Sequence, residues 1–323
     1  MDKKDLRIIY MGTPDFAVEA LRRLVEGGYN VVAVVTMPDK PMGRHQNSLQ
    51  ASPVKEYALS KNLPVLQPEK LKDTEFIEKL KSYHADLQAV VAFRMLPEVV
   101  WAMPRLGTFN IHASLLPQYR GAAPINWAII NGESESGLTT FFLQHDIDTG
   151  DIIDQVRVPI SDDCTFGELH DTLMSLSGDL AVKTVDSIIN GTVKSTPQST
   201  FATTDTPLRP APKIFKETCR IDLSRSLDEV YNFVRGLSPA PGAWANLRSG
   251  NQNTVIKIYG AQKVVACHEL PAGTIVCDGK KKLDIALKGG FLRLTELQLA
   301  GKKRMAASNF ICGFKLCDND MLI

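Results

Sequence analysis

The sequence predicts an α/β protein in which a doubly wound, mostly parallel sheet is followed by a small closed β-barrel. The sheet is predicted because short apolar runs rich in Val and Ile recur along residues 1–190, with segments of helical spacing between them. The barrel is predicted because residues 254–299 consist of short strand-like runs with Gly at nearly every junction. At 323 residues, the chain is also longer than one average domain.

A strand, a turn and a helix open the chain. Leu6–Met11 is an apolar strand, and Gly12 begins a tight turn. Thr13 suits the N-cap, and Pro14 the first position, of a helix that runs through Val25. The unit is Rossmann-like, but it lacks the GxGxxG glycines of a dinucleotide site. We therefore interpret it as an ordinary strand-to-helix turn.

The same alternation continues through the first domain. Strands are predicted at Val31–Thr36, Val65, Leu87–Phe93, Gly107–His112, Gly137–Gln144 and Ile152–Val158. Helices are predicted at Pro53–Lys61, Thr74–Ser82, Pro124–Ile130 and Thr165–Ile189. The connection from Thr36 to Ser52 has few apolar residues and no helical period, and a loop this long is uncommon unless it has a function. It carries a local positive group, Lys40, Arg44 and His45.

A change of composition marks the end of this domain. Ser195–Pro212 is rich in Ser, Thr and Pro, which is typical of an inter-domain linker. We therefore divide the chain into a domain of residues 1–190, a linker of residues 191–212 and a second domain of residues 213–323. Within the second domain, a helix is predicted from Ser226 to Leu237, because Ser226 and Glu229 have the spacing of a capping box.

Short strands fill the rest of the second domain. They are predicted at Thr254–Tyr259, Val264–Cys267, Gly273–Cys277, Leu283–Ala286 and Phe291–Leu299. Such a pattern fits a barrel of the oligonucleotide-binding (OB) type. Lys280–Lys282 and Lys302–Arg304 give it a basic rim, which fits RNA binding as well as ordinary solvated turns.

Composition narrows the class of protein. The net charge of +1 gives no global basic signal, so a nucleic-acid partner would be met by a local patch. No apolar run reaches the ~18 residues of a membrane span, and the N-terminal apolar stretch is too short for a signal peptide. The six cysteines form no CxxC pair and no metal-ligand cluster, which favours reduced thiols and no metal. We expect a cytoplasmic monomer without a transit peptide.

Residues 110–124, NIHASLLPQYRGAAP, combine polar side chains with residues that prevent regular structure. Asn110 and His112 bracket one apolar residue, so on a strand their side chains lie on the same face. Asp148 follows in a second turn before another apolar run. A carboxamide, an imidazole and a carboxylate can hold an oxyanion, exchange a proton near neutral pH and orient the imidazole. Because the set contains no nucleophile, it suits acyl transfer between two bound substrates.

Structural roles for the same residues stay open at this point. A histidine near a strand end is commonly structural, and an aspartate such as Asp148 commonly forms a turn. The GxSxG motif is absent, which argues against a serine hydrolase. His112 and His145 have no ligand partner at a recognised spacing, which argues against zinc.

Five motifs, in this order, resemble the methionyl-tRNA formyltransferase family. They are GTPDF (Gly12–Phe16), PDK-P-x-GR (Pro38–Arg44), SPVK (Ser52–Lys55), NIHASLLPQYRGAAPI (Asn110–Ile125) and DTGDI (Asp148–Ile152). The resemblance continues through RID (Arg220–Asp222) and LAGKK (Leu299–Lys303), so it covers nearly the whole chain. The NIHxSLLPxYRGAxP block is specific for folate-dependent formyltransferases as a class.

The resemblance implies transfer of a formyl group from 10-formyltetrahydrofolate to the α-amine of methionyl-initiator tRNA, with Asn110, His112 and Asp148 as catalytic residues. It implies a folate site on two segments, formed by Phe93, Met95, Leu96, Ser114, Leu115, Leu116 and Pro117. Arg44 stands at the arginine by which the family contacts the acceptor end of tRNA. Lys40 on the same loop and Lys213 in the OB-like domain are further candidates for tRNA contact.

The chain departs from the family pattern at two places. The family commonly has Tyr-Gly-x-Ile-Leu-Pro where this chain has FRMLP at residues 93–97. The family has Met-Asp-x-Gly-Leu-Asp where this chain has LQHDID, which adds His145 and Asp146. We prefer Asp148 to Asp146 as the catalytic carboxylate because the TGDI after it keeps the register. A formyltetrahydrofolate hydrolase, a sugar-nucleotide formyltransferase and an RNA-binding module without catalysis stay open as alternatives.

Overall fold

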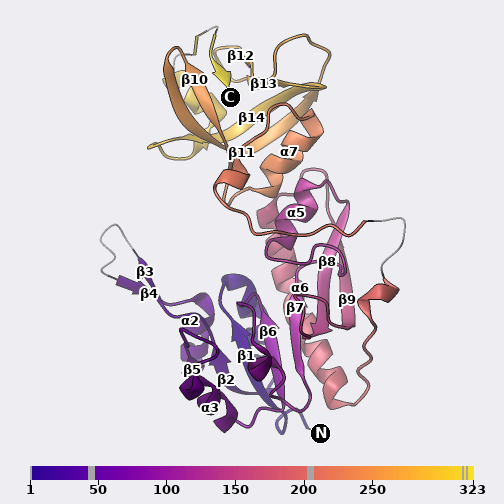
Figure 1. Ribbon diagram of the computed structural model, residues 1–323. Helices are drawn as coiled ribbons and strands as arrows, with labels where there is room; N and C mark the ends of the chain where they lie inside the picture. The colour runs from indigo at the N-terminus through magenta and orange to yellow at the C-terminus, as the bar shows by residue number, and fades with distance from the viewer. Residues whose placement is uncertain (1, 43–47, 202–206, 315, 318) are drawn as a thin grey trace. The chain divides into compact units, whose positions relative to one another are not determined.

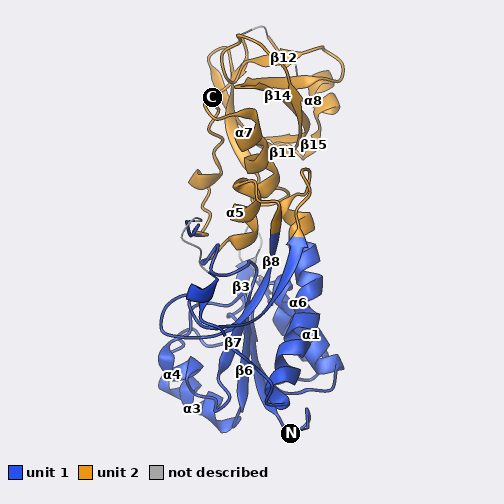
Figure 2. Ribbon diagram, turned by 90° about the vertical axis from the view of Figure 1, so that its right-hand side faces the viewer, with its two compact units in different colours: residues 1–121, 136–158, 170–210 blue, residues 122–135, 159–169, 211–323 orange. Residues whose placement is uncertain are grey.

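The computed structural model describes residues 2–42, 48–201, 207–314, 316–317 and 319–323. It divides into two compact units, which Figure 2 colours separately. Unit 1 comprises residues 1–121, 136–158 and 170–210, and unit 2 comprises residues 122–135, 159–169 and 211–323. Residues 122–135 and 159–169 thus belong to unit 2, although they precede the linker expected from composition.

In the described residues of unit 1, a seven-stranded sheet has the order β5-β2-β1-β6-β7-β8-β9 (Figure 1). Its strands are β1 (Arg7–Gly12), β2 (Asn30–Val35), β5 (Val65–Leu66), β6 (Leu87–Val91), β7 (Thr108–His112), β8 (Glu135–Phe142) and β9 (Ile152–Pro159). The first five in this order pair in parallel, and β8 pairs with β7 antiparallel. The predicted doubly wound, mostly parallel sheet is confirmed.

Helices and 3₁₀ turns connect these strands or follow the last of them. They are α1 (Val18–Glu26), α2 (Pro53–Ser60), α3 (Thr74–Ser82), α4 (Glu98–Trp101) and α6 (Phe166–Ile189), with 3₁₀ turns η1 (Asp15–Ala17) and η2 (Gln198–Thr200). The predicted helix start at Thr13 and Pro14 is wrong, because Pro14 is extended and η1 precedes α1. The buried hydroxyl of Tyr10 donates to the carbonyl of Ala17 at 2.5 Å, which supports this tighter turn.

The connection between Thr36 and Ser52, predicted as a long loop without a helical period, contains strands that the sequence analysis did not predict. The described part of this connection contains two short antiparallel strands, β3 (Lys40–Met42) and β4 (Ser48–Gln50). At the base of the pair, Asp39 accepts hydrogen bonds from Lys55 at 2.6 Å and Gln67 at 2.8 Å. The bond from Lys55 lowers the pKa of Asp39. Arg44 and His45 lie outside the described residues.

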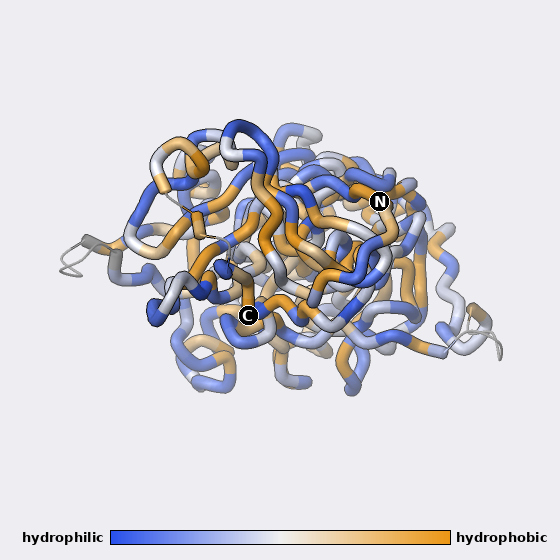
Figure 3. The backbone as a smooth tube through the Cα atoms, turned by 90° about the horizontal axis from the view of Figure 1, so that it is seen from above, coloured by the Kyte–Doolittle hydropathy of each residue, from blue (hydrophilic) through white to orange (hydrophobic). Residues whose placement is uncertain are grey.

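The core of unit 1 covers both faces of the sheet. On one face, Ile9 and Met11 of β1 pack in a cluster with Phe76 and Leu80 of α3. On the other face, Tyr10 is fully buried. Strands buried on both faces read as continuous apolar runs, which is why the sequence revealed them. Figure 3 shows such hydrophobic stretches alternating with hydrophilic ones along the backbone.

The described part of unit 2 contains a second, antiparallel sheet in the order β12-β13-β14-β11-β10-β16, with β15 on β14. Its strands are β10 (Ala243–Ser249), β11 (Gln252–Val265), β12 (Ile275–Cys277), β13 (Leu283–Leu287), β14 (Gly290–Leu299), β15 (Met305–Ala306) and β16 (Met321–Leu322). A bridge between Thr274 and Met321 brings the two ends of the sheet together, as a barrel requires. The predicted barrel is therefore confirmed.

Details of the barrel differ from the prediction. The expected strands at Thr254–Tyr259 and Val264–Cys267 are one strand, β11, whose register shifts around Gly260. Register shifts let a long strand bend around a barrel, so one strand reads as two short apolar runs. Strand β10 was missed because its sequence, AWANLRS, contains few residues that favour strands.

Helices cover the barrel and its approach. They are α5 (Pro124–Ile130), α7 (Leu227–Gly236) and α8 (Ala307–Gly313), with the 3₁₀ turn η3 (Glu217–Cys219). The predicted capping box is present, since Glu229 N donates to Ser226 Oγ and Ser226 N donates to Glu229. Asn126 donates to the carbonyl of Gly236 at 2.8 Å, and the buried Arg235 donates to Cys164 O at 2.8 Å. These bonds attach residues 122–135 and 159–169 to α7. No helix in the described part of the chain is long and apolar enough to cross a bilayer.

Candidate active site

Strand β7 positions two of the three predicted catalytic residues. Asn110 and His112 are two residues apart on this strand, so their side chains lie on the same face. His112 ends the strand opposite Thr139 of β8, and Asn110 lies between Val90 of β6 and Phe141 of β8. Between the flanking strands Asn110 is half-buried, and only 6% of His112 is exposed.

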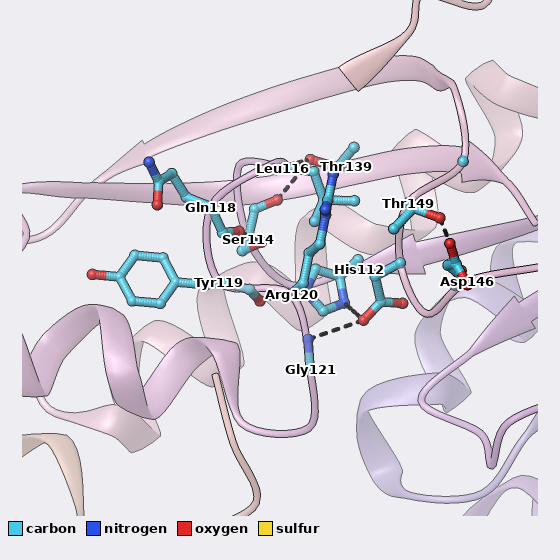
Figure 4. A network of polar contacts seen from close by, with 12 residues as sticks. His112, Ser114, Leu116, Gln118, Tyr119, Arg120, Gly121, Thr139, Asp146 and Thr149 are labelled. Carbon is cyan, nitrogen blue, oxygen red and sulfur yellow. Dashed lines mark hydrogen bonds and ion pairs between the residues drawn. The ribbon is translucent and has the colours of Figure 1, made fainter. Parts of the chain in front are cut away.

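The structure brings Asp148 to His112. His112 Nδ1 lies 3.8 Å from Asp148 Oδ2, and His112 Nε2 lies 2.8 Å from the carbonyl oxygen of Tyr119. A carbonyl oxygen only accepts hydrogen bonds, so Nε2 carries a hydrogen and donates it to Tyr119. Nδ1 is therefore the ring nitrogen left to exchange a proton with a substrate, and it faces a carboxylate. In Figure 4, the imidazole of His112 lies beside the backbone nitrogen of Gly121.

The turn that carries Asp148 is tightly constrained. Asp148 has φ +53°, a left-handed conformation that costs an L residue roughly 1–2 kcal/mol. Its Oδ2 accepts a hydrogen bond from the backbone N–H of Gly121 at 3.0 Å. A Cβ added at Gly150 would lie 1.6 Å from the carbonyl oxygen of Phe142, so only glycine fits there. The backbone thus aims the carboxylate at His112 at a cost in conformational energy.

The two extra titratable groups before Asp148 lie elsewhere. Asp146 is exposed, and its carbonyl accepts a hydrogen bond from Thr149 at 3.0 Å. His145 is exposed and lies 3.7 Å from Glu98. In the described part of the chain, the carboxylate that faces His112 is therefore that of Asp148, not that of Asp146.

Asn110 has an unpaired acceptor. Its Oδ1 is buried and has no hydrogen-bond partner among the residues that the structure describes. Leaving a buried acceptor unpaired costs about 1–3 kcal/mol, so a bound donor would be favoured there. A side-chain amide can accept and donate at once, which suits a group that meets both an amine and an oxyanion.

The candidate folate residues fall into two segments of unit 1. Met95 is 74% exposed, whereas Leu96 and Leu116 are buried in the core. The hydroxyl of Ser114 is buried and donates to the carbonyl of Gln118 at 2.7 Å. Of the remaining candidates, Phe93 and Leu115 are half-buried and Pro117 is buried. The buried side chains pack in the core beneath these segments. A ligand would therefore contact the exposed side chains and the backbone of the segments.

Arg94 fixes the first of these segments. Its guanidinium donates to the carbonyl of Glu69 at 2.8 Å and to the carbonyl of Pro68. Its Cζ atom also lies 5.6 Å from the centroid of the Phe93 ring. Burial lowers the pKa of Arg94. The charge by which this chain departs from the family pattern therefore holds residues 93–97 to residues 68–69.

The candidate RNA-binding residues are dispersed. Lys40 is exposed on β3, and Arg44 lies outside the described residues. Lys213 belongs to unit 2, where its Nζ lies 5.4 Å from the centroid of the Phe215 ring. Phe215 is 57% exposed. The structure thus brings His112 and Asp148 together, whereas Lys40 and Lys213 lie in different units.

Sequence analysis missed the groups that hold the His–Asp pair. Tyr119 contributes its carbonyl and Gly121 its N–H, and backbone groups leave no side-chain signal in a sequence. In the described part of the chain, no three His, Cys, Asp or Glu residues are grouped as a metal site would require.

Comparison with known proteins identifies the family. The formyl transferase family model matches residues 6–185, and the model of the formyl transferase C-terminal domain matches residues 213–315. The chain belongs to the formyl transferase family. The first match contains Asn110, His112 and Asp148, and the second begins at Lys213.

Relatives within the formyl transferase family match along their whole length. The methionyl-tRNA formyltransferase of Phocaeicola vulgatus is 63% identical over 321 residues, which is 99% of each chain. That of Bacteroides thetaiotaomicron is 61% identical over 319 residues, 98% of each chain. That of Porphyromonas gingivalis is 50% identical over 326 residues, 100% of each chain.

Solved structures share the formyl transferase fold at low identity. An N-formyltransferase from Helicobacter canadensis, in complex with folinic acid and dTDP-3-aminofucose, has a TM-score of 0.60 and 20% identity, covering 93% of this chain and 100% of that chain. HypX from Aquifex aeolicus, in complex with tetrahydrofolic acid, has a TM-score of 0.61 and 17% identity, covering 95% of this chain and 47% of that chain. These matches support the fold.

Proposed function

We propose that the protein transfers the formyl group of 10-formyltetrahydrofolate to the α-amine of methionyl-initiator tRNA, giving formylmethionyl-tRNA for translation initiation. The observation that carries this function is the match, at 50–63% identity and over essentially the whole chain, to relatives named methionyl-tRNA formyltransferase. The His112–Asp148 pair, with Asn110 on the same strand, supplies chemistry that suits the reaction.

The reaction needs no nucleophile from the protein. The amine nitrogen of the methionyl ester attacks the formyl carbon, and the formyl oxygen becomes an oxyanion. The bond from this carbon to N10 of the folate then breaks, N10 takes a proton and the amine loses one. A free α-amine has a pKa of about 7.7–8.0, and the ester carbonyl beside it in the substrate lowers this pKa, so much of the amine is unprotonated near neutral pH. Placement of the two substrates can remove several kcal/mol of the barrier, up to about 7–11 in favourable cases.

His112 and Asp148 act on the protons of this reaction. Nδ1 of His112 is the ring nitrogen that can take or give a proton, because Nε2 donates to Tyr119. When Nδ1 is protonated, the carboxylate of Asp148 at 3.8 Å stabilises the resulting charge. The same carboxylate favours loss of a proton from the attacking amine.

Asn110 stabilises the oxyanion. Its amide N–H donates to the formyl oxygen as charge develops there. Its buried Oδ1, which lacks a partner in the structure, accepts a hydrogen bond from the incoming amine. The carboxamide thus contacts both reacting atoms.

The folate lies against the two segments that follow β6 and β7. These are the loop with Phe93, Met95 and Leu96, and the segment Ser114–Pro117. The exposed side chain of Met95 and the clamp that Arg94 forms on residues 68–69 support a fixed surface for a flat ring system.

The tRNA is bound by cations on both units. Lys40 and Arg44 of the β3–β4 connection contact the acceptor end, and Lys213 contacts the backbone. The exposed ring of Phe215 beside Lys213 supports this role, since an aromatic face can stack on a base while a lysine meets phosphate. Residues 1–190 carry the formyl transfer site and contact the acceptor end, and residues 213–323 bind the rest of the tRNA. The protein is proposed to act as a monomer in the cytoplasm.

The test is a formylation assay with charged initiator tRNA and 10-formyltetrahydrofolate, run beside a reaction that lacks tRNA. We expect formylmethionyl-tRNA from the complete mixture and no formate release without tRNA. Equal formate release in both reactions would assign a hydrolase instead. Formylation that survives His112→Ala at the wild-type rate would remove the proposed role of the imidazole. Because phosphate contacts release counterions, tRNA affinity should also fall steeply with salt.

A further inference from the structure

Gln198 lies in the segment that composition marks as a linker, yet its side chain is buried. Only 4% of the residue is exposed, although it belongs to a Ser-, Thr- and Pro-rich stretch. The segment is fixed just before it, where Thr196 and Ile152 exchange two backbone hydrogen bonds at 2.8 and 2.9 Å. The 3₁₀ turn η2 then begins at Gln198 itself. Burial of a polar side chain is costly unless it is hydrogen-bonded, so the partners of Gln198 indicate its role.

The amide of Gln198 holds the turn of Asp148. Its Nε2 donates to the carbonyl oxygens of Asp148 and Gly150, at 2.8 Å in both cases. Asp148 has φ +53°, and a residue other than glycine keeps such a conformation only where the surroundings impose it. The two bonds from Gln198 fix the carbonyls on either side of Thr149, so they impose the turn from outside it.

The other end of the same amide holds the loop that supports His112. Gln198 Oε1 accepts two hydrogen bonds from Arg120, from Nε at 3.1 Å and from Nη2 at 2.6 Å. Arg120 lies between the two residues that touch the His–Asp pair. Tyr119 accepts from His112 through its carbonyl, and Gly121 donates to Asp148 through its N–H. Tyr119 also has a positive φ, of 60°.

All four hydrogen-bonding positions of the Gln198 amide are therefore used, two toward the Asp148 turn and two toward the loop after His112. We propose that Gln198, together with Arg120, is a positioning residue that keeps the carboxylate of Asp148 aligned with Nδ1 of His112. It touches neither substrate. The inference rests on the proposed function, because it assumes that the His–Asp pair takes part in formyl transfer.

The role can be separated from a merely structural one by a double-mutant cycle. The four proteins are wild type, Gln198→Ala, Asp148→Asn and the double variant, each assayed for kcat and for KM of both substrates. We expect Gln198→Ala to lower kcat by about 10- to 100-fold, the range typical of residues that orient a catalytic group. KM for each substrate should stay within about twofold, because only transition-state interactions are lost.

The decisive measurement is the effect of Gln198→Ala on kcat in the Asp148→Asn protein, which lacks the carboxylate. If Gln198 acts through Asp148, Gln198→Ala should cost less than about threefold in the Asp148→Asn background. Equal losses in the two backgrounds would overturn the proposal, and so would a rise in KM with kcat unchanged. A wild-type protein without formylation activity would instead refute the proposed function, so the two failures can be told apart.

Gln118 provides a matched control in the same region. Its side chain joins the same stretch, donating to the carbonyl of Pro207 and accepting from the N–H of Arg209, but it does not touch the Asp148 turn. Gln118→Ala should leave kcat within about threefold of wild type. A loss equal to that of Gln198→Ala would mean that any tether of this stretch has the same effect.

Conservative variants keep the test open if Gln198→Ala fails to fold. Gln198→Glu retains the partner for Arg120 but places a carboxylate oxygen against the carbonyls of Asp148 and Gly150. It should lose activity like the alanine variant, and a cooperative thermal unfolding transition shows that the variant is folded. If neither variant folds, Arg120→Lys is assayed in the same cycle and judged by the same criteria.

Discussion

The charge of Asp148 can be removed without changing the shape of its side chain. In Asp148→Asn, the amide oxygen still accepts the hydrogen bond that Gly121 N–H now donates at 3.0 Å. The turn at φ +53° also tolerates asparagine, which adopts left-handed conformations more readily than most residues. The substitution therefore isolates the electrostatic contribution of the carboxylate to the proposed step in which His112 carries a proton.

The size of this contribution follows from the distance. At 3.8 Å and an effective dielectric constant of about 20, two unit charges attract by about 4 kcal/mol. Desolvation of the two groups offsets part of this attraction, which leaves about 2–4 kcal/mol. A loss of that size in the transition state lowers the rate about 30- to 1000-fold. We expect this loss in kcat, with little change in KM for either substrate.

The assay is single-turnover formylation with saturating 10-formyltetrahydrofolate, which separates chemistry from product release. Asp146→Asn serves as the control, because Asp146 is exposed and its carboxylate has no described contact with His112. A loss of less than about threefold in Asp148→Asn would contradict the electrostatic reasoning, since it corresponds to under 1 kcal/mol. A large loss in Asp146→Asn would mean that Asp148 is not the carboxylate that acts on His112.

Arg44→Ala should raise KM for tRNA and leave folate binding, measured by fluorescence quenching, nearly intact; equal losses in both would contradict the assignment. Gly150→Ala should lower kcat about as much as Asp148→Asn, because its Cβ would lie 1.6 Å from the carbonyl oxygen of Phe142 and shift the turn. Full activity of this variant would show that the turn can relax without loss. Backbone N–H groups of residues 282, 280 and 281 lower the pKa of Asp278 to about 2. This value lies below the unfolded value of about 3.9, so the carboxylate stabilises the fold above pH ~4, and the contribution is lost as the pH falls toward 2. The urea midpoint of Asp278→Asn should therefore lie below that of wild type at pH 6, and the difference should shrink at pH 3; a constant difference would contradict this.

Sequence patterns predicted the elements whose burial follows a simple period. The central strands are buried on both faces, so their apolar runs are continuous and easily recognised. The capping box at Ser226 and Glu229 was predictable because it depends on two side chains at a fixed spacing. The two strands β3 and β4 and the strand β10 were not, because backbone pairing within a hairpin, rather than an apolar pattern of side chains, creates them.

The same distinction applies to the candidate site. Asn110 and His112 could be placed on one face from the sequence because both lie on one strand. Their approach to Asp148 was suggested by the family pattern, whereas the groups that produce it are the Tyr119 carbonyl, the Gly121 N–H and the amide of Gln198. Two of these are backbone groups, and the third lies 50 residues from its partner in a stretch that reads as a linker. No local pattern could have revealed them.

Conformational energy connects these observations. A left-handed turn at Asp148 and another at Tyr119 each oppose folding, and they flank the two hydrogen bonds that define the His112–Asp148 geometry. Gln198 offsets this cost with four hydrogen bonds, of which the bond to Gly150 is buried and the other three are partly buried. A hydrogen bond shielded from water is stronger than one at the surface. The strained turns and the hydrogen bonds of Gln198 together hold His112 Nδ1 at 3.8 Å from Asp148 Oδ2. The pair is therefore aligned before the substrates bind, and the reaction needs less rearrangement of the two side chains.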